Sequence, residues 1–107
     1  MTTLTIMSEN AYHVKVSIQA YYALNAHMEF LSRVNPDATG KQRREILAKI
    51  ALLSRNPYLY PVFDADPDVP EYRKMVIGRY LILYVIDEDG KTVGVDLIWD
   101  TRMDNVL

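Results

Sequence analysis

The residues from Glu71 to Arg102 (EYRKMVIGRYLILYVIDEDGKTVGVDLIWDTR) constrain the fold more than any other part of this chain. Two turn signals divide them into three segments. Gly78-Arg79 is typical of a two-residue hairpin connection, because glycine accepts the positive φ that such turns demand. Asp89-Gly90 is a stronger signal of the same kind. The stretch therefore predicts three consecutive antiparallel strands.

The second and third of these segments differ in their hydrophobic pattern. Residues 80–86 (YLILYVI) are apolar or aromatic at every position, which is typical of a central strand covered on both faces. Residues 93–100 alternate instead, because successive side chains of a strand point to opposite faces. One face of that strand is expected to carry Val93, Val95, Leu97 and Trp99, and the other Gly94, Asp96, Ile98 and Asp100. We expect a meander with one face buried and the other partly open.

A strand and two amphipathic helices are expected before the meander. Tyr12–Val16 alternates between apolar and polar residues, and Ser17 then stands where its hydroxyl can cap a helix. This first helix is expected to end near Val34, before the turn-forming residues 35–40 (NPDATG). A second helix is expected from about Lys41 to Arg55, because the following Asn-Pro disfavours helical geometry.

Apolar residues recur at helical spacing in both expected helices. They are Ala20, Leu24, Met28 and Leu31 in the first, and Ile46, Ile50 and Leu53 in the second. The element order β-α-α-β-β-β predicts an α+β fold, with a helical hairpin packed on a mainly antiparallel four-stranded sheet. The 107 residues (1–107) are expected to form a single domain, and residues 1–10 to be a frayed extension or an extra edge strand.

Composition excludes several kinds of site. The chain has no cysteine, so a disulfide framework, a thiol nucleophile and a thiolate zinc site are all excluded. His13 and His27 fall on different elements without a nearby carboxylate pair, so we expect neither a metal nor a cofactor. No apolar run approaches the ~20 residues that span a bilayer. With no signal-peptide pattern at the N-terminus, the expected location is the cytoplasm, away from membranes.

The charge is unevenly distributed along the chain. The formal net charge is −2, which does not indicate a general nucleic-acid binder. Arg73, Lys74 and Arg79 nevertheless fall together on the first hairpin, which indicates a local cationic patch. These side chains could bind phosphates or an acidic partner, or they could simply keep an exposed hairpin soluble.

The order and spacing of the motifs resemble the RelE/ParE superfamily, the toxins of type II toxin–antitoxin modules, which include plasmid stabilisation proteins. The resemblance covers the chain except for about the first ten residues. The residues that carry it are Ser17-Ile18-Gln19-Ala20, Asn56-Pro57, Tyr72-Arg73, Gly78, Tyr80, Tyr84, Ile86-Asp87 and Asp100-Thr101-Arg102.

This resemblance implies a toxin that inhibits growth and is neutralised by a cognate antitoxin protein, with two alternatives for its target. RelE-like members are metal-free ribonucleases that cut messenger RNA on the ribosome, and the candidate catalytic residues here would be Arg73, Arg102 and Asp100. ParE-like members act on DNA gyrase. The nucleases carry an arginine where this chain has Leu81, and the loss of one such cation commonly costs ~10²–10⁴-fold in rate. We therefore favour a ParE-like toxin, or one whose target is unassigned, over an enzyme.

The candidate residues for binding an antitoxin or a target are Arg73, Lys74, Arg79, Tyr80, Tyr84, Trp99, Arg102 and Leu52. Each has a structural alternative. The two tyrosines are more often core residues, Leu52 could be a lone surface leucine, and Asp100 is more often an exposed carboxylate at a strand end. The sequence leaves open whether the chain forms a homodimer. It also leaves open whether the chain is a non-toxic interaction module that keeps the fold.

Overall fold

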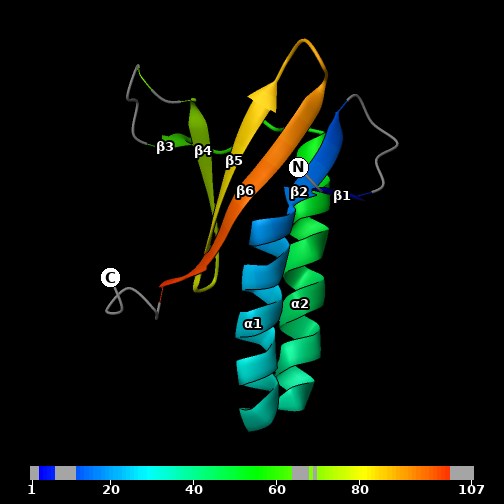
Figure 1. Ribbon diagram of the computed structural model, residues 1–107, viewed down its shortest axis with the longest axis vertical. Coiled ribbons are helices and arrows are strands. Elements are labelled where there is room, and N and C mark those ends of the chain that lie inside the picture. Colours follow the sequence, from blue (N-terminus) through cyan, green and yellow to red (C-terminus); the bar gives the residue numbers. More distant parts are fainter. Residues whose placement is uncertain (1–2, 7–11, 64–67, 69, 102–107) are drawn as a thin grey trace.

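The protein is a six-stranded sheet with a pair of long helices packed on one face, as the computed structural model shows (Figure 1). The structure describes residues 3–6, 12–63, 68 and 70–101. In chain order the elements are β1 (Thr3–Ile6), β2 (His13–Ser17), α1 (Ile18–Val34), α2 (Pro36–Ala51), the short 3₁₀ helix η1 (Leu52–Ser54), β3 (Val62–Phe63), β4 (Tyr72–Ile77), β5 (Tyr80–Asp87) and β6 (Thr92–Asp100).

The strands lie in the order β1-β2-β6-β5-β4-β3. Strands β4, β5 and β6 form the expected antiparallel meander, and β2 joins it as a parallel neighbour of β6. The α+β class and the four predicted strands are confirmed. Two short strands extend this sheet at its edges. Strand β1 pairs antiparallel with β2, as the edge-strand alternative predicted for part of residues 1–10, and the two-residue β3 pairs with β4.

Helix α1 carries the cap that its sequence predicts, whereas α2 spans Pro36–Ala51 instead of the predicted Lys41 to Arg55. Ser17 caps α1 by accepting a hydrogen bond from the backbone N–H of Ala20 at 3.1 Å. The prediction that residues 35–40 form a turn is wrong, because α2 starts at Pro36. Asn35 accepts from the N–H of Ala38 at 3.2 Å, so it acts as an N-cap with proline in the first helical turn. No helix in the described ranges is long and apolar enough to cross a membrane.

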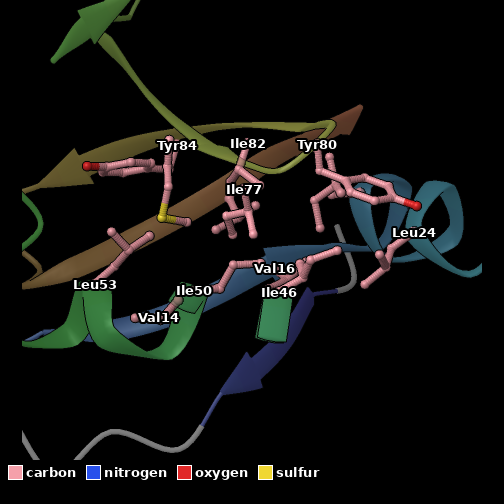
Figure 2. Close-up of a cluster of buried hydrophobic side chains, with 14 of the residues drawn as sticks. Val14, Val16, Leu24, Ile46, Ile50, Leu53, Ile77, Tyr80, Ile82 and Tyr84 are labelled. Atoms are coloured by element: carbon pink, nitrogen blue, oxygen red, sulfur yellow. The ribbon is translucent and has the colours of Figure 1, made fainter. Parts of the chain in front are cut away.

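The hydrophobic core lies between the helices and the sheet (Figure 2). Leu24 and Met28 of α1 and Ile46 and Ile50 of α2 are buried, which confirms the predicted stripes, and Leu31 is partly buried. The sheet contributes Val14, Val16, Met75, Ile77, Tyr80, Ile82, Tyr84, Val93, Val95 and Ile98. Burial of large apolar side chains stabilises a fold by about 1.5–3 kcal/mol each, so this layer holds the helical hairpin on the sheet.

The two hairpins of the meander differ. Gly78 has a φ of 57° between the paired residues Ile77 and Tyr80, which confirms the two-residue turn. The second connection is wider than predicted: it has four residues between the paired Asp87 and Thr92, and its positive φ falls on Lys91 rather than on Gly90. A Cβ added at position 90 would lie 2.9 Å from a carboxylate oxygen of Asp87, so any larger residue there would require this side chain to move.

A β-bulge overturns the predicted faces of the last strand. Leu97 pairs with Leu83, whereas Val95 pairs with the next residue of β5, so that Asp96 is an extra residue on β6. An extra residue reverses the inside–outside alternation beyond it. Val95 and Ile98 are both completely buried for this reason, and Trp99 lies on the opposite face from Val95.

Candidate functional site

Arg73 and Lys74, the two cations predicted to act together, lie on opposite faces of β4. Arg73 pairs with the buried Tyr84 and therefore faces the helices, while Lys74 pairs with the half-buried Leu83 on the other face. Adjacent residues of a strand necessarily diverge in this way. The single cationic patch predicted on the first hairpin is thus divided between two sides of the sheet.

The guanidinium of Arg73 anchors the connection between η1 and β3. It donates hydrogen bonds to the carbonyl oxygens of Tyr60 at 2.6 Å and Tyr58 at 3.5 Å, and it lies 5.0 Å from the centre of the Tyr58 ring. An ion pair with Glu71 at 3.7 Å completes its contacts. Its side chain is only 17% exposed, so Arg73 mainly fixes this connection to the sheet.

Tyr84 supports the same connection from within the core. Its hydroxyl donates to the carbonyl oxygen of Pro57 at 2.6 Å, and burial raises the pKa of the phenol to about 12. Figure 2 shows this ring beneath β5, with its hydroxyl directed away from Ile82 and Ile77. Tyr80 is equally buried, and its ring lies 6.0 Å from that of His27 on α1. The expectation that both tyrosines are core residues is confirmed, so neither offers its ring to a partner in this structure.

Glu88 joins three segments at the β5–β6 end of the sheet. Its carboxylate accepts hydrogen bonds from the hydroxyl of Tyr58 at 2.5 Å, from the hydroxyl of Tyr12 at 2.9 Å and from the ammonium of Lys91. These donors hold the pKa of Glu88 at about 2, and the shared carboxylate raises the pKa of Tyr58 to about 12. Lys91 also lies 5.1 Å from the centre of the Tyr12 ring. Because its groups satisfy one another, this cluster holds segments together rather than presenting a free site.

The face of the sheet opposite the helices is apolar, no helix of the described residues packs on it, and we call it the open face. Cross-strand pairing places its residues side by side, with Val76 next to Leu81 and Leu81 next to Trp99. Its members on the meander are Tyr72, Lys74, Val76, Leu81, Leu83, Val85, Leu97 and Trp99, none of which is fully buried. The prediction that β5 is covered on both faces is therefore wrong.

Polar groups border this apolar surface. Tyr72 donates a hydrogen bond to the carboxylate of Asp96 at 2.8 Å, and Lys74 lies 5.7 Å from the centre of the Phe63 ring at the β3 edge. Lys15 is exposed on β2, beside Gly94 of β6. An apolar centre with lysines on two sides suits an amphipathic protein segment that carries acidic residues.

Arg79, Leu52 and Asp100 lie apart from this surface. Arg79 is exposed in the β4–β5 turn, where its carbonyl accepts from the N–H of Thr101 at 2.8 Å, and Leu52 is 54% exposed in η1. Asp100 was expected to be an exposed carboxylate, but it is 4% exposed because the bulge turns it toward the helices beside Tyr80. Arg102 lies outside the described residues.

Sequence reasoning missed the apolar half of the open face. Leu81 was noted only as the residue that replaces a nuclease arginine, and Leu83 was not singled out at all. The signal was present, because an uninterrupted apolar run in a strand must put large residues on both faces. Within the described ranges, no group of three His, Asp or Glu side chains is arranged to hold a metal ion.

Comparison with known proteins agrees with the resemblance seen in the sequence. A family model described as the ParE toxin of type II toxin–antitoxin system, parDE, matches residues 14–105. The matched range contains both helices, the whole meander and the open face. No curated protein matches the chain.

Proposed function

The chain belongs to the ParE toxin family, and from this premise we propose that it arrests growth by binding DNA gyrase rather than by cutting messenger RNA. It is the toxin of a type II toxin–antitoxin module, and a cognate antitoxin neutralises it. The identification of gyrase as the target is our proposal. A target of this kind requires the chain to act in the cytoplasm.

The observation that supports binding over RNA cleavage is that Arg73 and Asp100, two of the candidate catalytic residues, lie on the helix-facing side of the sheet and are already bonded or buried. Ribonuclease chemistry on a 2′-hydroxyl needs a base and cations that meet at one phosphate. Arg73 faces the helices and is occupied by backbone carbonyls, while Asp100 is buried beneath the sheet. Neither can reach an RNA strand laid on the open face, where Leu81 stands in place of the arginine of the nucleases.

The two targets can be distinguished by expressing the chain without its antitoxin. We expect purified gyrase to lose its supercoiling activity in the presence of the chain, and cellular transcripts to stay intact during the growth arrest. Arg73→Ala, if it folds, should still inhibit gyrase, since this residue is assigned to the fold. Cut transcripts together with normal supercoiling activity would identify a ribonuclease instead. Normal growth and unaffected gyrase would identify a non-toxic interaction module.

We further propose that the antitoxin covers the open face. The partner is a protein segment, and the face offers an apolar centre with Lys74 and Lys15 at its borders, which suits apolar anchors flanked by carboxylates. Docking there would remove Leu83 and Trp99 from water without disturbing the helix-facing core. The alternative that sequence raised is a contact at the helical hairpin through Leu52.

Matched variants separate these two docking places. Leu83→Asp puts a charge in the centre of the open face, and we expect it to weaken antitoxin binding at least ~30-fold, the effect of losing an interface hot spot. Leu52→Asp makes the same change on an exposed residue of η1 and should bind normally. Calorimetric titration measures both affinities, and circular dichroism checks that both variants are folded. If Leu52→Asp weakened binding and Leu83→Asp did not, the antitoxin would be assigned to the end of the helical hairpin instead.

A further inference from the structure

Helix α1 carries a second apolar stripe on its exposed side. Tyr22 is 65% exposed, Phe30 is 66% exposed and Val34 is 74% exposed, and the exposed Ala26 lies between the two aromatic residues. These four residues recur at every fourth position, and we call them the α1 ridge. Amphipathic helices normally turn polar residues to solvent, so a second apolar stripe opposite the core-facing one requires an explanation.

The position of the helix leaves this ridge uncovered by the sheet. The C-terminal turns of α1 extend beyond the strands, where α2 runs beside them (Figure 1). Arg43 of α2 contacts Tyr21 and Asn25, which lie on a different side of α1 from the ridge. The ridge is also distinct from the open face, because α1 packs on the opposite side of the sheet.

The spacing of the ridge specifies a geometry of contact. Residues at i, i+4, i+8 and i+12 form one of the ridges that interdigitate when two helices cross at about −50°. A ridge of this kind can pack against an identical one about a two-fold axis, which is the arrangement of most homodimers. Ala26 is the small residue within it, and a small side chain at a crossing point lets two helix backbones approach closely.

The charges beside the ridge are compatible with self-association. Glu29 and Arg33 border it, each with a side chain 72% exposed, and their side chains pair with each other at 3.3 Å. The border thus carries one charge of each sign. In a two-fold pair the carboxylate of one copy can meet the guanidinium of the other, whereas a border of a single sign would repel its copy.

We propose that the α1 ridge is the surface through which two copies of this chain pair, helix α1 against helix α1, with the crossing point near Ala26. The exposed parts of its three large side chains amount to on the order of 400 Å² per copy. Two such surfaces bury less than the ~1,200 Å² of a standard stable interface. The pair is therefore weak and depends on concentration, and it leaves the open face free for the antitoxin.

Disulfide trapping tests this pairing directly, because the chain contains no cysteine that could interfere. We place a single cysteine in the full-length chain as Ala26→Cys and oxidise it mildly. Near a helix crossing point the two Cα atoms come within the 4.4–6.8 Å that a disulfide requires. Ala48→Cys is the matched control, since Ala48 is an exposed alanine on α2.

The expected result is a disulfide-linked dimer of Ala26→Cys on a non-reducing gel, formed at least ~10-fold faster than that of Ala48→Cys. Adding Phe30→Glu to the Ala26→Cys chain should abolish this difference without unfolding an exposed helix face. Equal rates at the two positions, or no effect of Phe30→Glu, would overturn the proposal. A chain whose Ala26→Cys residue links only to a cysteine-bearing antitoxin would also overturn it, and would assign the ridge to the antitoxin.

Discussion

Both faces of the central strand β5 carry large apolar or aromatic side chains, but their surroundings are very different. On the helix-facing side Tyr80, Ile82 and Tyr84 are completely buried, whereas on the open face Leu81, Leu83 and Val85 are only partly buried. The apolar character of a residue therefore does not tell which face of a strand is the core. What decides it here is the helical hairpin, which covers one side only (Figure 1).

The neighbouring cations of β4 show the same difference. Arg73 shares its face with the core and is bound to the carbonyl of Tyr60, while Lys74 lies on the open face beside the Phe63 ring. One residue of displacement along the strand separates a side chain bound to the backbone of the fold from one that lies on the open face. Paired substitutions, one on each face, test whether the two faces differ in this way.

The largest expected difference is between Ile82→Ala and Leu83→Ala. Removing the fully buried Ile82 side chain should lower the free energy of unfolding by about 2–5 kcal/mol, because a cavity remains in the core. The same truncation at Leu83 should cost about 1 kcal/mol or less, since water already reaches that face. Urea unfolding followed by circular dichroism measures both values. Equal losses would mean that the open face is covered in the isolated chain.

A smaller difference is expected between Arg73→Ala and Lys74→Ala. Loss of the guanidinium leaves the carbonyl of Tyr60 without its charged donor, which should cost about 1.5–3 kcal/mol of unfolding free energy. Lys74→Ala should change stability by no more than about 0.5 kcal/mol. Thermal unfolding of the two variants beside the unaltered chain provides the measurement. A larger loss at Lys74 would contradict the assignment of these residues to opposite faces.

The smallest effect concerns the Glu88 cluster, which lies away from both faces. The pKa of Glu88 is held at about 2, below its ordinary value of 4.5, so its contribution to stability is complete above pH 4.5 and is lost as the pH falls toward 2. Because this carboxylate lies at the surface, the contribution is small. We expect Glu88→Gln to flatten the decline of the melting temperature over that pH range. Glu45→Gln, at an exposed position of α2, is the control and should leave the decline unchanged.

Much of the fold follows from local sequence signals. Ser17 as a cap, Gly78 in a tight turn and the helical spacing of Ile46 and Ile50 each act through their near neighbours, and each was placed correctly. The family resemblance is confirmed as well, because it depends on the order of motifs along the chain, which can be read without the structure. The start of α2 was missed, since Asn35-Pro36 is compatible with a turn and equally with the first turn of a helix.

The candidate site was harder to predict, since each of its residues depends on a partner distant in the sequence. Nothing in the residues near Arg73 indicates that the connection after η1 places the carbonyl oxygen of Tyr60 beside its guanidinium. Asp100 was expected to be exposed, but the bulge at Asp96 places its side chain on the buried, helix-facing side of the sheet. Local sequence is enough to predict most of the helices and strands, because those preferences arise between residues a few positions apart. It is not enough to predict which apolar face of the sheet forms the core and which stays open, because that depends on where the helices pack.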